Sequence, residues 1–409
     1  MKTTLSIAII SLGTVIVFGQ AGNWREHPAI QYSTSPVHDP VAELNQKLAG
    51  GAATLSFDST FGYLKSVLSA LKVPVESQLL VFSKTSLQSI LISPDNPRAI
   101  FFNDSVAVGW VRGSPLLELA VQDPQQGMIF YTLAQTPQTR PVLAAEETGV
   151  CLGCHQTPAS LDVPGGVVRS VFPGAAGTIV AELAGVEADH RTPFDNRWGG
   201  WYVSGKLGPL GHLANATVSG VREGADGKES RIANREPLPE KFATSTYLTP
   251  YSDVVALAVF EHQMHMMNLI TRLRWEARTG STPSALRNSA AEFVAYLLFI
   301  DEAPLTGRLE GTSGFTAKFA AMGPFDGKGR SLRQFDLANR LMRYPCSYMI
   351  YSDAFNALPR KAKDAIYERM WEVLSGQEKD SKYKRLSATD RQAVVEILKD
   401  TLPEFAAGQ

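Results

Sequence analysis

Two cysteines and a histidine at a fixed spacing are the residues of this chain best suited to chemistry. Cys151 and Cys154 are separated by two residues and His155 follows directly, which gives the pattern C-x-x-C-H. Each thiol can form a thioether bond with one vinyl group of a porphyrin, and the adjacent imidazole can bind the iron. The motif therefore predicts one covalently attached haem, with Cys151 and Cys154 as anchors and His155 as the proximal iron ligand.

Two other uses of paired cysteines stay open. A redox dithiol of the thioredoxin kind needs a strand before the pair and a helix after it, and Pro158 and Pro164-Gly165-Gly166 fit a helix poorly. A structural zinc site usually needs a second pair of cysteine or histidine ligands. The remaining cysteine, Cys346, is distant in the sequence and has apolar neighbours, so we expect it to be a buried thiol.

The N-terminus has the pattern of an export signal. Lys2 precedes an apolar run from Leu5 to Phe18, and Gly19 and Ala21 form a small-x-small cleavage site. We predict a signal peptide, residues 1–21, cleaved near Ala21, with an uncleaved anchor as the alternative and no further membrane span. Haem attachment at this motif takes place on the far side of an energy-transducing membrane, so the expected location is periplasmic or secreted, in a bacterium.

Composition limits the class of protein. The chain has 409 residues, 44% of them apolar and 19% charged, which is ordinary for a globular protein and long enough for two domains. A net charge of −1 gives no support to nucleic-acid binding. No P-loop, dinucleotide-binding fingerprint or Ser-His-Asp order is convincing.

The distribution of apolar residues predicts an α+β fold, with a β-rich haem-bearing N-terminal domain followed by an all-helical C-terminal domain. We expect an extended leader at 22–50, the β-rich domain at 51–235 and the helical domain at 236–409. Short apolar runs separated by turn residues predict antiparallel strands at 79–82, 99–102, 106–111, 116–121, 128–133, 166–172 and 178–183.

Helical spacing appears once before these runs and repeatedly after them. Ser252 is a candidate N-cap for the first long helix, Thr282 precedes Pro283 at the start of the next, and Ser387 with Asp390 resembles a capping box. The predicted helices cover 58–71, 252–278, 283–299, 331–343, 360–375 and 388–400.

The identity of the sixth iron ligand separates an electron carrier from an enzyme. We predict His190 first and His212 second, because both lie in loops of the same β-rich half as the haem. Met264 and the histidines beside it belong to a helix that is apolar nearly all round, where such residues usually form core. Two imidazole ligands would give a low-potential haem.

Further residues are candidates for the cofactor's surroundings. Trp198, Trp201 and Tyr202 offer aromatic walls. An arginine can pair with a haem propionate through charge-assisted hydrogen bonds, and the candidates are Arg169, Arg191 and Arg197.

The motif and the export signal together resemble those of c-type cytochromes. More of the chain is similar to a group of uncharacterised bacterial exported proteins with one cytochrome c motif. The similarity covers most of the mature chain and is carried by 189–193, 197–205 and 343–352. It implies haem and a periplasmic setting but supplies no activity.

Three functions follow as hypotheses. The first is electron transfer, with a redox partner protein or a small redox substrate. The second is a haem-dependent oxidoreductase whose sixth iron position is open. The third is a haem-based sensor or docking module in which the helical half provides the partner surface.

Overall fold

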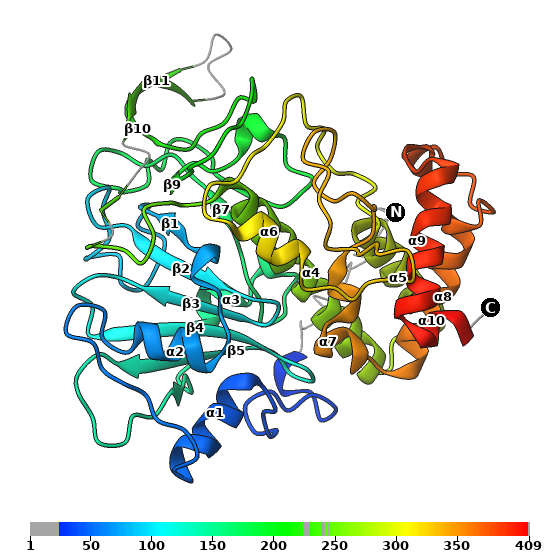
Figure 1. Ribbon diagram of the computed structural model, residues 1–409, viewed down its shortest axis with the longest axis horizontal. Helices are drawn as coiled ribbons and strands as arrows, with labels where there is room; N and C mark the ends of the chain where they lie inside the picture. The colour runs from blue at the N-terminus through cyan, green and yellow to red at the C-terminus, as the bar shows by residue number, and fades with distance from the viewer. Residues whose placement is uncertain (1–23, 224–229, 239–241, 244, 408–409) are drawn as a thin grey trace, which may run out of the picture.

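An antiparallel sheet and a set of helices divide the molecule between them (Figure 1). The computed structural model describes residues 24–223, 230–238, 242–243 and 245–407, so the predicted signal peptide lies outside the described residues. The strands come from the N-terminal half and the long helices from the C-terminal half. This confirms the predicted α+β fold with a helical C-terminal part.

The main sheet has seven strands in the order β6-β5-β4-β3-β2-β1-β9, and every neighbouring pair is antiparallel. Five of these strands match the apolar runs predicted between residues 79 and 133. The strands are β1 (Leu79–Val81), β2 (Arg98–Phe102), β3 (Val106–Trp110), β4 (Leu116–Asp123), β5 (Gly127–Ala134), β6 (Ala144–Ala145) and β9 (Trp201–Tyr202).

Strand predictions beyond the motif were largely wrong. The run 166–172 contributes only β7 (Arg169–Ser170), which pairs with β8 (Val186–Glu187), and 178–183 forms a single bridge between Pro173 and Ile179. A hairpin of β10 (Ala216–Glu223) and β11 (Ser230–Pro237) was not predicted. Its strands are rich in charged and small residues, so they lack the apolar alternation that marks a half-buried strand.

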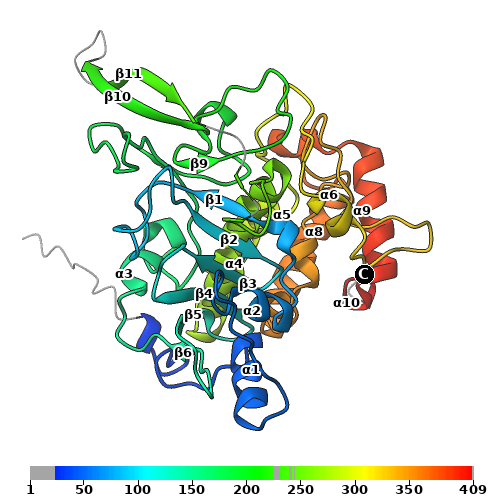
Figure 2. The ribbon, with the colours of Figure 1, turned by 60° about the vertical axis from the view of Figure 1, so that its left-hand side comes forward.

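Each face of the main sheet packs against a different layer, because successive side chains of a strand point to opposite sides. One face, with Phe101, Val108 and Leu119, shares a core with α1 (Pro40–Ala49) and α2 (Leu64–Ala70). The other face shares a core with the helical half. Figure 2 shows α2 and α3 (Leu152–His155) on opposite sides of the central strands.

The 25-residue helix α4 (Val254–Arg278) joins the sheet to the other helices and is buried on nearly all sides. The Phe260 ring lies 4.9 Å from that of Phe102 on β2. The N-cap is Asp253, whose carboxylate accepts from the backbone N–H groups of the first turn, and not Ser252 as predicted. The Ser252 hydroxyl instead donates to the Tyr202 carbonyl, 2.6 Å away.

The remaining helices pack around α4. The predicted N-cap Thr282 and the capping box at Ser387 are both present. The helix predicted at 331–343 is wrong: this segment forms turns, because the Asp336 carboxylate accepts from the backbone of Ala338 and Asn339 and competes with a helix. The α-helices are α5 (Pro283–Leu297), α6 (Phe315–Ala320), α7 (Asp353–Asn356), α8 (Arg360–Leu374), α9 (Ala388–Thr401) and α10 (Pro403–Ala407).

The hydrophobic core crosses the boundary predicted between the β-rich and helical regions, since sheet residues and helix residues belong to one buried cluster. The leader predicted as extended contains the helix α1. In the described part of the chain, no helix combines the length and apolar character needed to cross a membrane.

Candidate functional site

The C-x-x-C-H motif forms the single helical turn α3, and local hydrogen bonds hold it. The His155 backbone N–H donates to the Cys151 carbonyl over 3.0 Å, and a carboxylate oxygen of Glu146 accepts from the Cys151 N–H over 3.2 Å. Both thiols are free, with Cys151 half-buried and Cys154 exposed. One turn therefore brings two reduced thiols and one imidazole together at the edge of the core.

The His155 ring is oriented by one hydrogen bond and one aromatic contact. The Nδ1 atom lies 2.9 Å from the Gly165 carbonyl oxygen, and the ring centroid lies 4.8 Å from that of Phe130 on β5. Because a carbonyl only accepts, Nδ1 carries the proton and Nε2 presents a lone pair. No hydrogen bond within the described residues engages Nε2. Burial lowers the pKa of His155, which favours the neutral form that binds metals.

Helix α4 fixes the loop that supplies this carbonyl. The Asn268 side chain accepts from the Gly166 N–H over 3.0 Å and donates to the Gly166 carbonyl over 2.8 Å. A Cβ added at Gly165 would come within 2.1 Å of the Asn268 amide oxygen, and one at Gly166 within 2.5 Å of the Met264 sulfur. Two glycines are thus required for the loop to approach α4 closely enough to orient His155.

The surroundings of the motif do not favour the two other uses of paired cysteines. Burial, then the carboxylates of Glu146 and Glu118, raise the pKa of Cys151 to about 11, whereas a reactive redox dithiol needs a lowered thiol pKa. The four-residue turn is not the long helix that follows a thioredoxin-type pair. Within the described residues, no three histidine, cysteine or acidic side chains converge as ligands for a metal such as zinc.

The structure does not bring His190 to His155. His190 is buried on the side of α4 that carries His262, with the two Nδ1 atoms 2.7 Å apart. His155 is held through the loop that packs on Met264 and Asn268, which project from the opposite side of this helix. The His262 Nε2 atom in turn lies 2.7 Å from the Ser347 hydroxyl.

Two further predicted residues, His212 and Trp198, lie side by side. Their ring centroids are 6.0 Å apart, and the His212 Nδ1 atom accepts from the Ala214 N–H over 3.2 Å. Trp198 is fully buried beside Phe194, with centroids 5.5 Å apart, so it exposes no surface to which a cofactor could bind.

The three predicted arginines occupy different surroundings. Arg197 is buried and its guanidinium lies 3.3 Å from the Glu261 carboxylate. Arg191 forms a 2.6 Å ion pair with Asp189. Arg169 remains exposed and lies loosely against Glu187 at 3.8 Å, and its charge contributes to lowering the pKa of His155. Of the three, Arg169 is therefore the one placed toward the motif.

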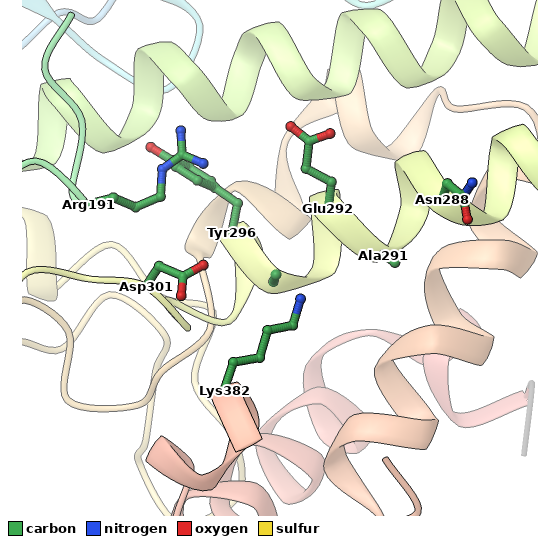
Figure 3. A pocket seen from close by; sticks show the side chains of 8 residues that line it. Arg191, Asn288, Ala291, Glu292, Tyr296, Asp301 and Lys382 are labelled. Atoms are coloured by element: carbon green, nitrogen blue, oxygen red, sulfur yellow. The ribbon is translucent and has the colours of Figure 1, made fainter. Parts of the chain in front are cut away.

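Arg191 also lines a surface cavity of about 320 Å³ on the helical half. Figure 3 shows Arg191 and Tyr296 on one side of this cavity, with Glu292, Asp301 and Lys382 around it. The Arg191 guanidinium lies 4.9 Å above the Tyr296 ring, and its Nη2 atom lies 3.2 Å from the Nε2 atom of His265. The cavity belongs to the surroundings of the His190–His262 contact, separate from the motif.

Sequence reasoning missed the residues that position His155. Asn268 and Phe130 contact the motif or its loop across long stretches of chain, and no spacing pattern links them to Cys151–His155.

No protein-family model, curated protein or solved structure matches the chain. The resemblance to c-type cytochromes therefore depends on the motif and the export pattern alone.

Proposed function

We propose that this protein is an exported single-haem c-type cytochrome that transfers electrons. In this proposal Cys151 and Cys154 hold the haem through thioether bonds and His155 is the proximal iron ligand. The observation that carries it is the hydrogen bond from His155 Nδ1 to the Gly165 carbonyl. Metal-binding histidines commonly donate their second ring nitrogen to a carbonyl or carboxylate in this way, which fixes the ring and leaves the other nitrogen for the metal.

The residues present fit the cofactor. Two reduced thiols, one exposed and one half-buried, lie on the turn that carries an imidazole with an unengaged Nε2 atom. A bound haem would supply an iron centre that cycles between ferric and ferrous states. The chain's own part is to hold His155 in one orientation, through Gly165, and to keep it neutral by burial.

Haem content tests this proposal directly. The full chain, expressed for export together with haem-attachment machinery, should keep its haem after denaturation and give a pyridine haemochrome spectrum. A Cys151→Ala, Cys154→Ala double variant should lose the covalent haem, whereas Cys346→Ala, at a buried thiol away from the motif, should keep it. A wild-type chain without covalent haem would refute the proposal.

A second candidate is a haem-dependent oxidoreductase with an open sixth iron position. The position of His190 favours it, because the histidine predicted first as the sixth ligand is bonded to His262 on the other side of α4. Carbon monoxide separates the two candidates. A spectrum of the reduced protein that CO does not change indicates a filled sixth position and an electron carrier, and a rapid shift indicates an open site.

A further inference from the structure

The centre of the main sheet is incompletely covered on the face that carries the motif. Ala107 on β3 and Ala120 on β4 are directly paired across two central strands, yet both are partly exposed. Their neighbours Phe102 and Phe130, at the two ends of the same cross-strand row, are buried. Central strands of a sheet with both faces packed normally bury such small apolar residues, so the row from Ala107 to Phe130 forms a strip of partly exposed, flat apolar surface.

One end of the strip, at Phe130, contacts His155 of the motif. Ala120 is paired with Phe130, whose ring centroid lies 4.8 Å from that of His155. Cys151 packs against the same buried cluster as Ala107 and Ala120. Helix α4 packs on the neighbouring end of this face through Phe260, whereas Ala107 and Ala120 stay partly exposed.

Arg98 lies over the next cross-strand pair, two residues along the strands from Ala107 and Ala120. Gly109 is paired with Glu118, and the Arg98 guanidinium lies over this glycine: a Cβ at position 109 would come within 2.3 Å of its Nη2 atom. Nη2 also forms a 2.9 Å ion pair with Glu118. The Nε atom of Arg98 is buried without a hydrogen-bond partner, which is costly for a charged donor unless a further acceptor is present.

We propose that the porphyrin lies over Ala107 and Ala120, with one of its propionates bonded to the Arg98 guanidinium that covers Gly109. This inference rests on the proposed function. Two strand spacings of about 4.8 Å separate β5 from β3, so the strip from Phe130 to Ala107 is about 10 Å wide, the scale of a porphyrin ring. The methyl groups of Ala107 and Ala120 provide the flat surface that such a ring requires, and the absent side chain at Gly109 leaves room for the Arg98 guanidinium beside it.

The propionate is the acceptor that the unpaired Nε atom of Arg98 lacks. A guanidinium presents five N–H donors, of which the ion pair with Glu118 engages one atom, Nη2. Arg169 stands exposed near the motif and provides a second cation for the second propionate. Charge-assisted bonds to carboxylates are specific enough to distinguish a haem from its methyl ester, which keeps the ring and loses the charge.

The test compares haem with haem dimethyl ester. The full-length Cys151→Ala, Cys154→Ala chain, which binds without thioether bonds, is titrated with each ligand and followed by its Soret absorbance. We expect this chain to prefer haem by tenfold or more. Arg98→Leu should reduce this preference to about onefold to threefold, and Arg98→Lys, which keeps the charge, should restore part of it. The matched control is Arg112→Leu, because Arg112 is exposed just beyond β3 and bonded to Asn96.

A second pair of variants tests the surface itself. Ala107→Phe fills the strip and should weaken the binding of both ligands at least tenfold, while Ala49→Phe, at an exposed site on α1, should change neither. An unchanged preference in Arg98→Leu, or full binding by Ala107→Phe, overturns this inference but leaves the proposed function standing. If wild type lacks covalent haem and the double variant binds neither ligand, both proposals fail. If Arg98→Leu does not fold, the ligand preference of Arg98→Lys and the binding of both ligands by Ala107→Phe still test the inference.

Discussion

His190 and His262, both buried, meet through their Nδ1 atoms, 2.7 Å apart. One ring must donate its Nδ1 proton and the other accept it, so the accepting ring is neutral. Tyr296 stacks on both rings, with centroids 4.1 Å from that of His190 and 5.2 Å from that of His262. Burial lowers the pKa of His262 to about 3 and that of His190 well below its ordinary value.

These histidines predict a loss of stability in acid. Their folded pKa values lie below the unfolded value near 6.5, so between these limits the unfolded state binds more protons. The free energy of unfolding should fall as the pH drops below about 6.5, by about 1.4 kcal/mol per pH unit for each histidine. Glu261 offsets the pH slope of one histidine between about pH 7 and pH 4.5. Burial raises the pKa of Glu261 to about 7, so in this range the folded state binds the extra proton. Urea titrations from pH 8 to 4 measure the net slope.

A single variant isolates the contribution of this contact. His190→Asn keeps an acceptor for His262 and removes one titrating ring, so its pH slope should be shallower than that of wild type by about 1.4 kcal/mol per unit. His38→Asn, at an exposed position outside the cluster, is the matched control. Equal slopes in wild type and His190→Asn would show that the histidine pair does not set the acid limit.

The buried ion pair between Arg197 and Glu261 gives a second prediction. Arg197→Met leaves a carboxylate in the core and should cost about 3–5 kcal/mol at pH 8. The cost should be smaller at pH 6, because the pKa of Glu261 rises further without the arginine and a protonated carboxyl is cheaper to bury. Glu261→Gln added to Arg197→Met should recover part of the loss. A penalty independent of pH would contradict this account.

Asn268 is predicted to stabilise the loop behind His155. Asn268→Leu removes two hydrogen bonds and leaves the buried N–H and C=O of Gly166 without partners, at a cost of about 2–4 kcal/mol. Denaturant unfolding measures this loss, and Asn288→Leu, at an exposed site on α5, is the control. A variant as stable as wild type would mean that the loop does not depend on α4.

The sixth-ligand prediction is tested by His190→Ala. Since His190 contacts His262 and not the motif, we expect the visible spectrum of the haem protein and its CO response to stay as in wild type. The variant should instead unfold more easily, because it leaves a cavity and an unpaired His262. A site that becomes open to CO in this variant would restore His190 as the ligand. Met264→Ala, at the contact between α4 and Gly166, is the variant with which the spectrum and CO response of His190→Ala are compared.

The sequence was most informative where local chemistry determines structure. Alternating apolar residues between Leu79 and Leu133 predicted five strands, and side-chain caps at Thr282 and Ser387 placed two helix starts. The segment 331–343 has helical spacing, but a local turn at Asp336 prevents the helix. The spacing of apolar residues could not show this competition.

Only the contiguous part of the candidate site could be predicted from the sequence, and its role in haem attachment stays a prediction. C-x-x-C-H is contiguous, so its chemistry can be read from the chain. Proximity in sequence suggested His190 as a partner of His155, yet their loops pack on opposite sides of α4. Arg98 precedes the motif by a long stretch of chain. Only the pairing of β2, β3 and β4 places it over Gly109 and beside Glu118, on the sheet face that carries the motif. Contacts that depend on strand register leave no short-range pattern.

The hydrogen bonds between Gly166 and Asn268 join residues 102 positions apart, and this separation has a consequence for maturation. If the chain is exported and loaded with haem as proposed, it crosses the membrane from its N-terminus and presents Cys151 and Cys154 well before α4 arrives. During that interval the motif would be accessible to attachment enzymes on all sides. Docking of α4 would then position the Gly165 carbonyl and fix the ring of His155. In the proposed function, this order separates cofactor loading from the final closure of the site.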